Sequence, residues 1–193
     1  MTRTHTVLLI ILLFAETKIT SAQTASARSA VTLPSAAQVI KTACTEAASS
    51  HKKVFIIFHA SWCGWCHRMD SIMSAPACKQ LFADHYVIKH LVIMENGDKK
   101  SLENPGAQEL YTKYAGEKGG GIPFWLIIDA NGAVIADSRN KPDGAAPGST
   151  GNNVGCPSEP DEVVYFIKVL HATSSLTAAQ LDVIREKFIM GKG

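Results

Sequence analysis

The stretch ASWCGWCHRM, residues 60–69, places two cysteines three positions apart directly after an apolar run. The spacing of Cys63 and Cys66 is that of a redox dithiol, and with His67 it is also the spacing of a covalently attached haem. The sequence on either side of the motif must therefore decide between these two chemistries.

The residues around the cysteines predict a strand, a short loop and a helix. VFIIFH, residues 54–59, is a continuous β-branched and aromatic run, which is typical of a central strand buried on both faces. Residues 65–73 carry apolar side chains at helical spacing. Cys63 is then expected where this helix begins, with Cys66 one turn further along the same face. Free N–H groups and the helix dipole stabilise a thiolate there, so we expect Cys63 to be the exposed nucleophile and Cys66 the buried resolving cysteine.

The rest of the chain alternates predicted helices and strands. In chain order they are a helix from the Ser35–Gln38 capping box, the strand 54–59, the helix 65–73 with a second short helix near 78–82, a strand at 86–94, a helix at 107–115, a hairpin at 124–137, a helix from Pro160 and a helix from Thr177. Residues 95–106 and 139–157 are predicted to be loops. This order indicates an α/β fold with a central mixed sheet, helices on both faces and an extra C-terminal helix.

Composition indicates one folded domain with no nucleic-acid partner. The chain has 193 residues, of which 46% are hydrophobic and 19% charged, enough for one sizeable core. The formal net charge is only +2, and no cluster of Lys and Arg stands out.

The N-terminus has the layout of a signal peptide. Arg3 is followed by the apolar run VLLIILLFA and by small residues that end at Ala22. The apolar run is too short to span a bilayer as a stable helix, although an uncleaved anchor is the rival interpretation. We therefore expect a signal peptide at 1–22, a flexible leader at 23–34 and one domain at 35–193, with its core at 36–171 and its last helix at 176–190.

Three sequence segments together resemble the thioredoxin superfamily. They are the strand at 54–58, Trp-Cys-Gly-Trp-Cys at 62–66, and Gly-Ile-Pro at 121–123 before the strand FWLIID. The resemblance covers about residues 36–171. More narrowly, the chain is similar to exported thioredoxin-like proteins related to the soluble domain of a membrane thiol-reductase.

The resemblance implies a periplasmic, soluble thiol:disulfide oxidoreductase that acts in cell redox homeostasis. Its partners would be protein thiols and disulfides, with a membrane electron-transfer thiol reductase as electron donor. Cys63 and Cys66 would need no cofactor and no metal. Pro123 would be cis and, with Ile122, would shape a groove for a substrate strand. The apolar residue before this proline also resembles reducing members of the superfamily.

The chain departs from the family pattern at two positions. Ile57 stands where the family often has an acidic residue, so the usual proton acceptor for Cys66 is missing. His59 follows on the same strand face and is a candidate replacement, or simply a strand-end side chain. His67 is either a tuning residue for the dithiol or a solvated helix residue. Trp65 replaces the proline of many thioredoxins, so the reduction potential does not follow from the resemblance.

Other roles for the motif remain open. Trp62 and Trp65 are expected to form an apolar contact surface, and a binding module without turnover could use the same surface. A haem would need a distal ligand such as Met94 or Met190, but the strand, the Gly-Ile-Pro segment and the hairpin do not suit a haem protein. A zinc site would need ligands beyond the dithiol, and no second CxxC is present. A purely structural bridge across two residues would add little stability.

The three remaining cysteines occur singly. Cys44 lies on an apolar helix face and is expected in the core. Cys78 is expected there as well. Cys156 lies in the Gly-rich loop and is the best candidate for a free thiol or for a bridge to Cys78.

Overall fold

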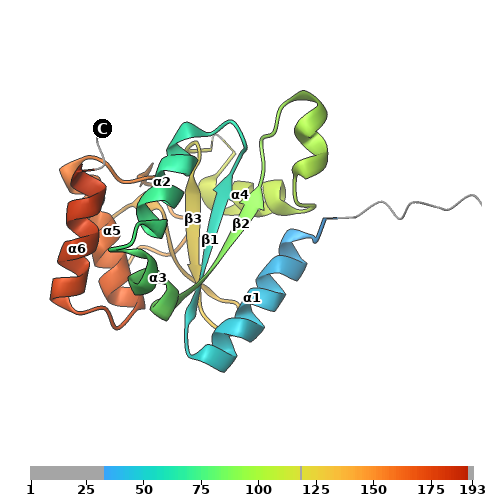
Figure 1. Cartoon of the computed structure of the whole chain (residues 1–193). Coiled ribbons are helices and arrows are strands. Elements are labelled where there is room, and N and C mark those ends of the chain that lie inside the picture. Colours follow the sequence, from blue (N-terminus) through green and yellow to red (C-terminus); the bar gives the residue numbers. More distant parts are fainter. Residues whose placement is uncertain (1–32, 118, 191–193) are drawn as a thin grey trace, which may run out of the picture. The chain divides into compact units, whose positions relative to one another are not determined.

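A four-stranded mixed sheet with the strand order β2-β1-β3-β4 lies at the centre of the computed structural model (Figure 1). The structure describes residues 33–117 and 119–190, so the predicted signal peptide and nearly all of the predicted leader lie outside the described residues. Within the described part of the chain, no helix is long and apolar enough to cross a membrane.

The strand before the cysteines is central, as its apolar run predicts. β1 (Lys53–His59) pairs in parallel with β2 (Tyr86–Val92) and antiparallel with β3 (Phe124–Ile128). β3 continues antiparallel into β4 (Val134–Asp137), which completes the predicted hairpin. Residues 54–58 are all buried because helices cover both faces of this strand.

The helices divide between the two faces of the sheet. α1 (Ala36–Ser50) and α4 (Ala107–Ala115) pack on the face that carries Val54, Ile56 and Phe58. The opposite face is covered by α2 (Gly64–Ser74), α3 (Lys79–His85), α5 (Pro160–Thr173) and α6 (Ala178–Met190). Phe55 and Trp125 lie at the centre of this second core, close to Phe166. The predicted α/β fold with helices on both faces is confirmed, and the extra C-terminal helix packs on the domain.

The predicted capping residues begin their helices. Ser35 Oγ accepts a hydrogen bond from the Gln38 N–H, and the Gln38 side chain accepts one from the Ser35 N–H. The same reciprocal pair joins Thr177 and Gln180. Each pair satisfies N–H groups that a helix start leaves without a partner.

Both predicted loops contain ordered structure that the sequence pattern does not reveal. Residues 95–106 include a 3₁₀ helix, η1 (Gly97–Leu102). Residues 139–157 include a second, two-stranded sheet formed by β5 (Arg139–Asn140) and β6 (Asn152–Asn153). Strands of two residues are too short to show alternation, and long-range hydrogen bonds hold them in place.

Candidate active site

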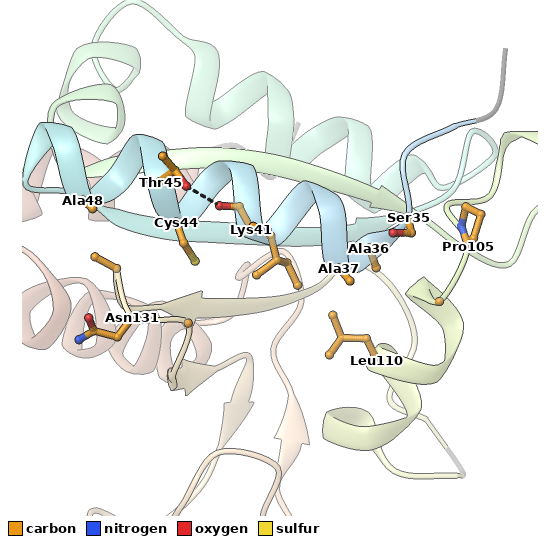
Figure 2. A pocket seen from close by; sticks show the side chains of 14 residues that line it. Ser35, Ala36, Ala37, Lys41, Cys44, Thr45, Ala48, Pro105, Leu110 and Asn131 are labelled. Carbon is orange, nitrogen blue, oxygen red and sulfur yellow. Dashed lines mark hydrogen bonds between the residues drawn. The ribbon is translucent and has the colours of Figure 1, made fainter.

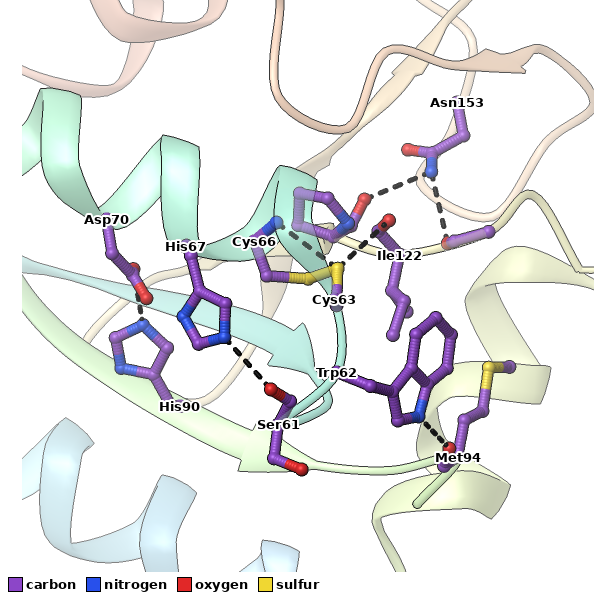
Figure 3. The surroundings of a disulfide bond; sticks show 12 residues. Ser61, Trp62, Cys63, Cys66, His67, Asp70, His90, Met94, Ile122 and Asn153 are labelled. Atoms are coloured by element: carbon purple, nitrogen blue, oxygen red, sulfur yellow. Dashed lines mark hydrogen bonds and ion pairs between the residues drawn. A yellow bond between two sulfur atoms is a disulfide. The ribbon is translucent and has the colours of Figure 1, made fainter. Parts of the chain in front are cut away.

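The two cysteines of the motif form a disulfide at the start of α2, with an S–S distance of 2.06 Å (Figure 3). Cys63 is the N-cap residue of this helix, and the Cys66 N–H donates to Cys63 Sγ at 3.2 Å. This N–H belongs to the first helical turn, where no backbone acceptor is available. Once the disulfide is reduced, the donor and the helix dipole are placed to stabilise a thiolate on Cys63.

The expectation of an exposed nucleophile is wrong for this disulfide form. Cys63 is only 4% exposed and Cys66 1% exposed. Ala60 and Ile122 pack against the two cysteines and cover them. Sequence spacing could not show this, because Ile122 belongs to a segment that reaches the motif only through the fold.

Two tryptophans form an exposed rim around the disulfide. Trp62 is 52% and Trp65 54% exposed, although both are large apolar residues. The Trp62 indole N–H donates to the Met94 carbonyl at 2.7 Å, which fixes the ring beside the site (Figure 3). The Arg68 guanidinium lies 4.9 Å from the centre of the Trp65 ring. These rings have the exposure that a contact surface requires.

The Gly-Ile-Pro segment lies beside the cysteines, as the resemblance implies. The peptide bond between Ile122 and Pro123 is cis. The Ile122 carbonyl oxygen lies 3.5 Å from Cys63 Sγ (Figure 3). The segment therefore borders the sulfur atom that a partner would attack.

His59 is a partly buried base near this end of the sheet. Its Nδ1 is buried and has no hydrogen-bond partner among the described residues. Burial lowers the pKa of His59, and the neighbouring His90 lowers it further. The two rings lie 4.8 Å apart, and His90 is itself 2.8 Å from Asp70. Burial therefore favours the neutral form of the His59 ring, while Ile57, at the position of the family's acid, is a core residue.

His67 is exposed and bonds to the loop before the cysteines. Its Nε2 donates to the Ser61 carbonyl at 3.0 Å (Figure 3). No hydrogen bond to either sulfur is found for it within the described residues. A tuning role for His67 stays a prediction.

Glu95 is a site residue that the sequence reading missed. It is buried, and its carboxylate accepts hydrogen bonds from the Ser61 N–H at 2.6 Å and the Ser61 hydroxyl at 2.9 Å. The Ser61 backbone hydrogen bond is the main reason that the pKa of Glu95 is lowered. A signal was available, because Glu95 follows the strand that pairs in parallel with β1, and parallel strands end at the same edge of a sheet.

The other three cysteines are reduced and buried. The core positions predicted for Cys44 and Cys78 are confirmed, and Cys156 is a free thiol rather than a partner of Cys78. Burial raises the pKa of Cys156 to about 11, which disfavours the thiolate. In the described part of the chain, no group of three or more His, Cys, Asp or Glu residues is arranged to hold a metal ion.

A separate apolar groove lies against α1, away from the disulfide (Figure 2). Its volume is about 990 Å³, and its walls come from α1, the start of α4 and the turn after β3. Cys44 faces this groove, where its thiol donates a long hydrogen bond of 3.7 Å to the Asp129 carbonyl. Burial raises the pKa of Cys44, so this thiol is a weak nucleophile.

A family model described as thioredoxin-like matches residues 36–130, which include both cysteines and the cis-proline segment. These residues belong to the thioredoxin-like family. The match and the Cys63–Cys66 disulfide confirm the predicted class, a thioredoxin-superfamily thiol:disulfide oxidoreductase. They also favour a redox dithiol over a covalently attached haem at Cys63 and Cys66.

Comparisons with curated proteins gave no match. Among solved structures, the chain is similar to a disulphide isomerase from Xylella fastidiosa Temecula1, with 24% identity, a TM-score of 0.41 and coverage of 56% of this chain and 80% of that one. A DsbH oxidoreductase has 23% identity, a TM-score of 0.39 and coverage of 73% and 83%. A thioredoxin from Thermus thermophilus has 18% identity, a TM-score of 0.41 and coverage of 73% and 86%. Because these TM-scores are low, the assignment to the thioredoxin superfamily rests on the family match and on the Cys63–Cys66 disulfide.

Proposed function

We propose that this protein is an exported thiol:disulfide oxidoreductase that exchanges disulfides with protein partners and acts as a reductase. The observation that carries the proposal is the Cys63–Cys66 disulfide at the start of α2, bordered by the cis-proline segment. The dithiol itself carries two electrons, so the exchange needs no further group.

Reduction of a partner would take two exchange steps. In the first, the Cys63 thiolate attacks a sulfur of the partner disulfide, forms a mixed disulfide and releases one partner thiolate. In the second, the Cys66 thiolate attacks Cys63 Sγ and releases the other partner thiolate, which leaves the disulfide seen here. The two electrons lost by the dithiol are gained by the partner.

The second step needs a base for the Cys66 proton. With Ile57 in the place of the family's acid, His59 is the candidate, because it is the ionisable residue that follows on the same face of β1. Its lowered pKa keeps the ring neutral but makes it a weak base. A neutral imidazole accepts a proton, whereas a protonated one does not. His67 remains a second candidate for tuning the dithiol.

The surface that binds a protein partner would combine exposed aromatic rings with the backbone of the cis-proline segment. Trp62 and Trp65 offer exposed rings near the disulfide. Ile122 and Pro123 border Cys63, where an extended peptide could pair with the chain. This arrangement suits unfolded or thiol-bearing proteins.

Export, the reducing direction and the electron donor rest on the sequence. The layout of residues 1–22 supports export to the periplasm, and Ile122 before the proline supports a reductase. A soluble exported reductase needs reducing equivalents from outside its compartment, so a membrane electron-transfer thiol reductase is the proposed donor. If residues 1–40 direct export, their fusion to alkaline phosphatase should give an active enzyme, whereas an inactive fusion that accumulates in the cytoplasm would contradict export.

Insulin reduction with dithiothreitol as donor tests the exchange chemistry. Wild-type protein should accelerate the reaction, and Cys63→Ser should abolish the acceleration. Reduced Cys66→Ser, mixed with insulin after dithiothreitol is removed, should form a mixed disulfide with insulin. Cys44→Ala is the matched control, because that thiol lies outside the redox pair and should leave the rate unchanged. Equal activity in wild type and Cys63→Ser would remove the basis of the proposal.

A binding module without turnover is the second candidate. The low exposure of Cys63 beside the exposed Trp62 and Trp65 favours it, since a partner could bind the rim without reaching the sulfur. Partner capture that persists in Cys63→Ser, together with a wild-type protein that does not reduce insulin, would support this alternative.

A further inference from the structure

The side chain of Asn153 binds the cis-proline segment from outside the family-matched part of the chain (Figure 3). Its Nδ2 donates to the carbonyls of Gly120 at 2.9 Å, Gly121 at 3.2 Å and Pro123 at 3.1 Å. Asn153 belongs to β6, within the loop that follows β4. One amide thus reaches three carbonyls of the segment that borders the redox disulfide.

The orientation of this amide is set by its own partners. Asn153 Oδ1 accepts from the Ser138 hydroxyl at 2.6 Å and from the Gly155 N–H at 3.1 Å. Ser138 is fully buried, and its Oγ accepts in turn from the Trp125 N–H in β3. Because the acceptor end is fixed by two donors, the donor end of the amide must face the cis-proline segment.

The loop and the segment also lie too close for additional side-chain atoms. A Cβ added to Gly120 would meet Asn153 Cβ at 2.7 Å. A Cβ added to Gly155 would meet the Pro123 carbonyl oxygen at 2.9 Å. Backbone approach this close requires glycine at both positions and leaves the segment little room to shift towards β6.

The fourth carbonyl of the segment points elsewhere. Asn153 binds the carbonyls of residues 120, 121 and 123, while the carbonyl of Ile122 lies 3.5 Å from Cys63 Sγ. We infer that Asn153 is a positioning residue for thiol:disulfide exchange, which holds the cis-proline segment in a fixed place beside Cys63 so that a protein substrate can pair with it. This inference rests on the proposed exchange function.

Positioning by Asn153 should matter only to substrates that use the segment. A protein substrate lies along the segment, and without Asn153 it must order the segment on binding. A small disulfide needs access to the sulfur alone. Loss of Asn153 should therefore raise KM for a protein substrate, but it should not slow the reaction with a small disulfide.

The test compares Asn153→Ala with Asn152→Ala, a matched control because Asn152 is the exposed preceding residue of β6. Each variant is assayed for insulin reduction, for reaction of the reduced protein with 5,5′-dithiobis(2-nitrobenzoic acid), and for its thermal midpoint. A substrate that must order the segment on binding binds more weakly, so KM for insulin should rise roughly tenfold or more in Asn153→Ala. Its kcat should match that of Asn152→Ala, and its rate with the small disulfide should not fall below the rate of Asn152→Ala.

An unchanged KM in folded Asn153→Ala would overturn the inference, as would an equal loss with both substrates. If that variant does not fold, Gly120→Ala tests the same contact from the other side, since its Cβ would push the segment away from Asn153. The same rise in KM is expected there, and an unchanged KM refutes the inference. A wild-type protein that reduces no insulin would instead refute the proposed function, and this inference with it.

Discussion

Removing the buried carboxylate of Asp137 should destabilise the protein far more than removing a surface acid. Asp137 ends β4 and is fully buried, and it accepts from Lys141 Nζ at 2.6 Å and from the backbone N–H groups of Arg139 and Gly148 at 2.9 and 2.6 Å. The Lys141 side chain is only 7% exposed. Asp137→Ala therefore leaves a buried positive charge and two N–H groups without their acceptor.

The size of the loss follows from this burial. An exposed ion pair contributes about 0–1 kcal/mol, whereas breaking a buried pair by removing one partner costs about 3–5 kcal/mol, because the remaining charge is uncompensated. We expect the larger value for Asp137→Ala. In a chain of this size each kcal/mol shifts Tm by about 2–4 °C, so Tm should fall by roughly 6–20 °C. Adding Lys141→Met removes the orphaned charge and should restore part of the loss.

Urea unfolding followed by far-UV circular dichroism at pH 7 measures the free energy of unfolding, and thermal unfolding followed by the same signal measures Tm. Asp143→Ala is the matched control, because Asp143 pairs with Lys168 on the surface and should lose less than about 1 kcal/mol. A loss in Asp137→Ala as small as that of the control would show that the buried pair contributes no more than a surface pair. A double variant of Asp137 and Lys141 whose loss equals the sum of the two single losses would show that the buried pair is uncoupled.

Three further outcomes are expected from urea midpoints. The lowered pKa of His59 means that the folded state resists its protonation, so stability should fall as pH drops below about 6.5, and His59→Phe should fall less between pH 7 and 5. Glu95 also has a lowered pKa, so its contribution, present above about pH 4.3, should be lost with further acid, and Glu95→Gln should flatten that region. Phe166→Ala should cost about 3–5 kcal/mol, since the ring is fully buried, whereas exposed Val164→Ala should change stability by less than about 0.5 kcal/mol.

Local sequence patterns were sufficient to predict most of the fold. The apolar run at 54–59 predicts the central strand because it places apolar side chains on both faces of the strand, and both faces must then be covered. The helix starts at Ser35 and Thr177 follow from capping residues three positions apart, an interaction that lies within one helical turn. The helix predicted at 107–115 has the same bounds in the structure, and Gly116 is its C-cap.

The parts of the site that depend on distant contacts were not predictable. Cys63 is covered by Ile122, which approaches only after β3 pairs with β1. Asn153 meets the cis-proline segment through a loop with no periodic pattern. In each case the deciding hydrogen bond or packing contact joins residues that no local rule connects.

If Cys63 and Cys66 form a working redox pair, the protein has a measurable reduction potential. Purified protein from residue 23 onwards would be titrated with dithiothreitol, with Trp62 and Trp65 fluorescence as the readout. We expect one two-electron transition near the thioredoxin value of about −270 mV, which is lost in Cys63→Ser. A transition near about −120 mV would contradict the reducing direction, and the absence of any transition would contradict the redox pair itself.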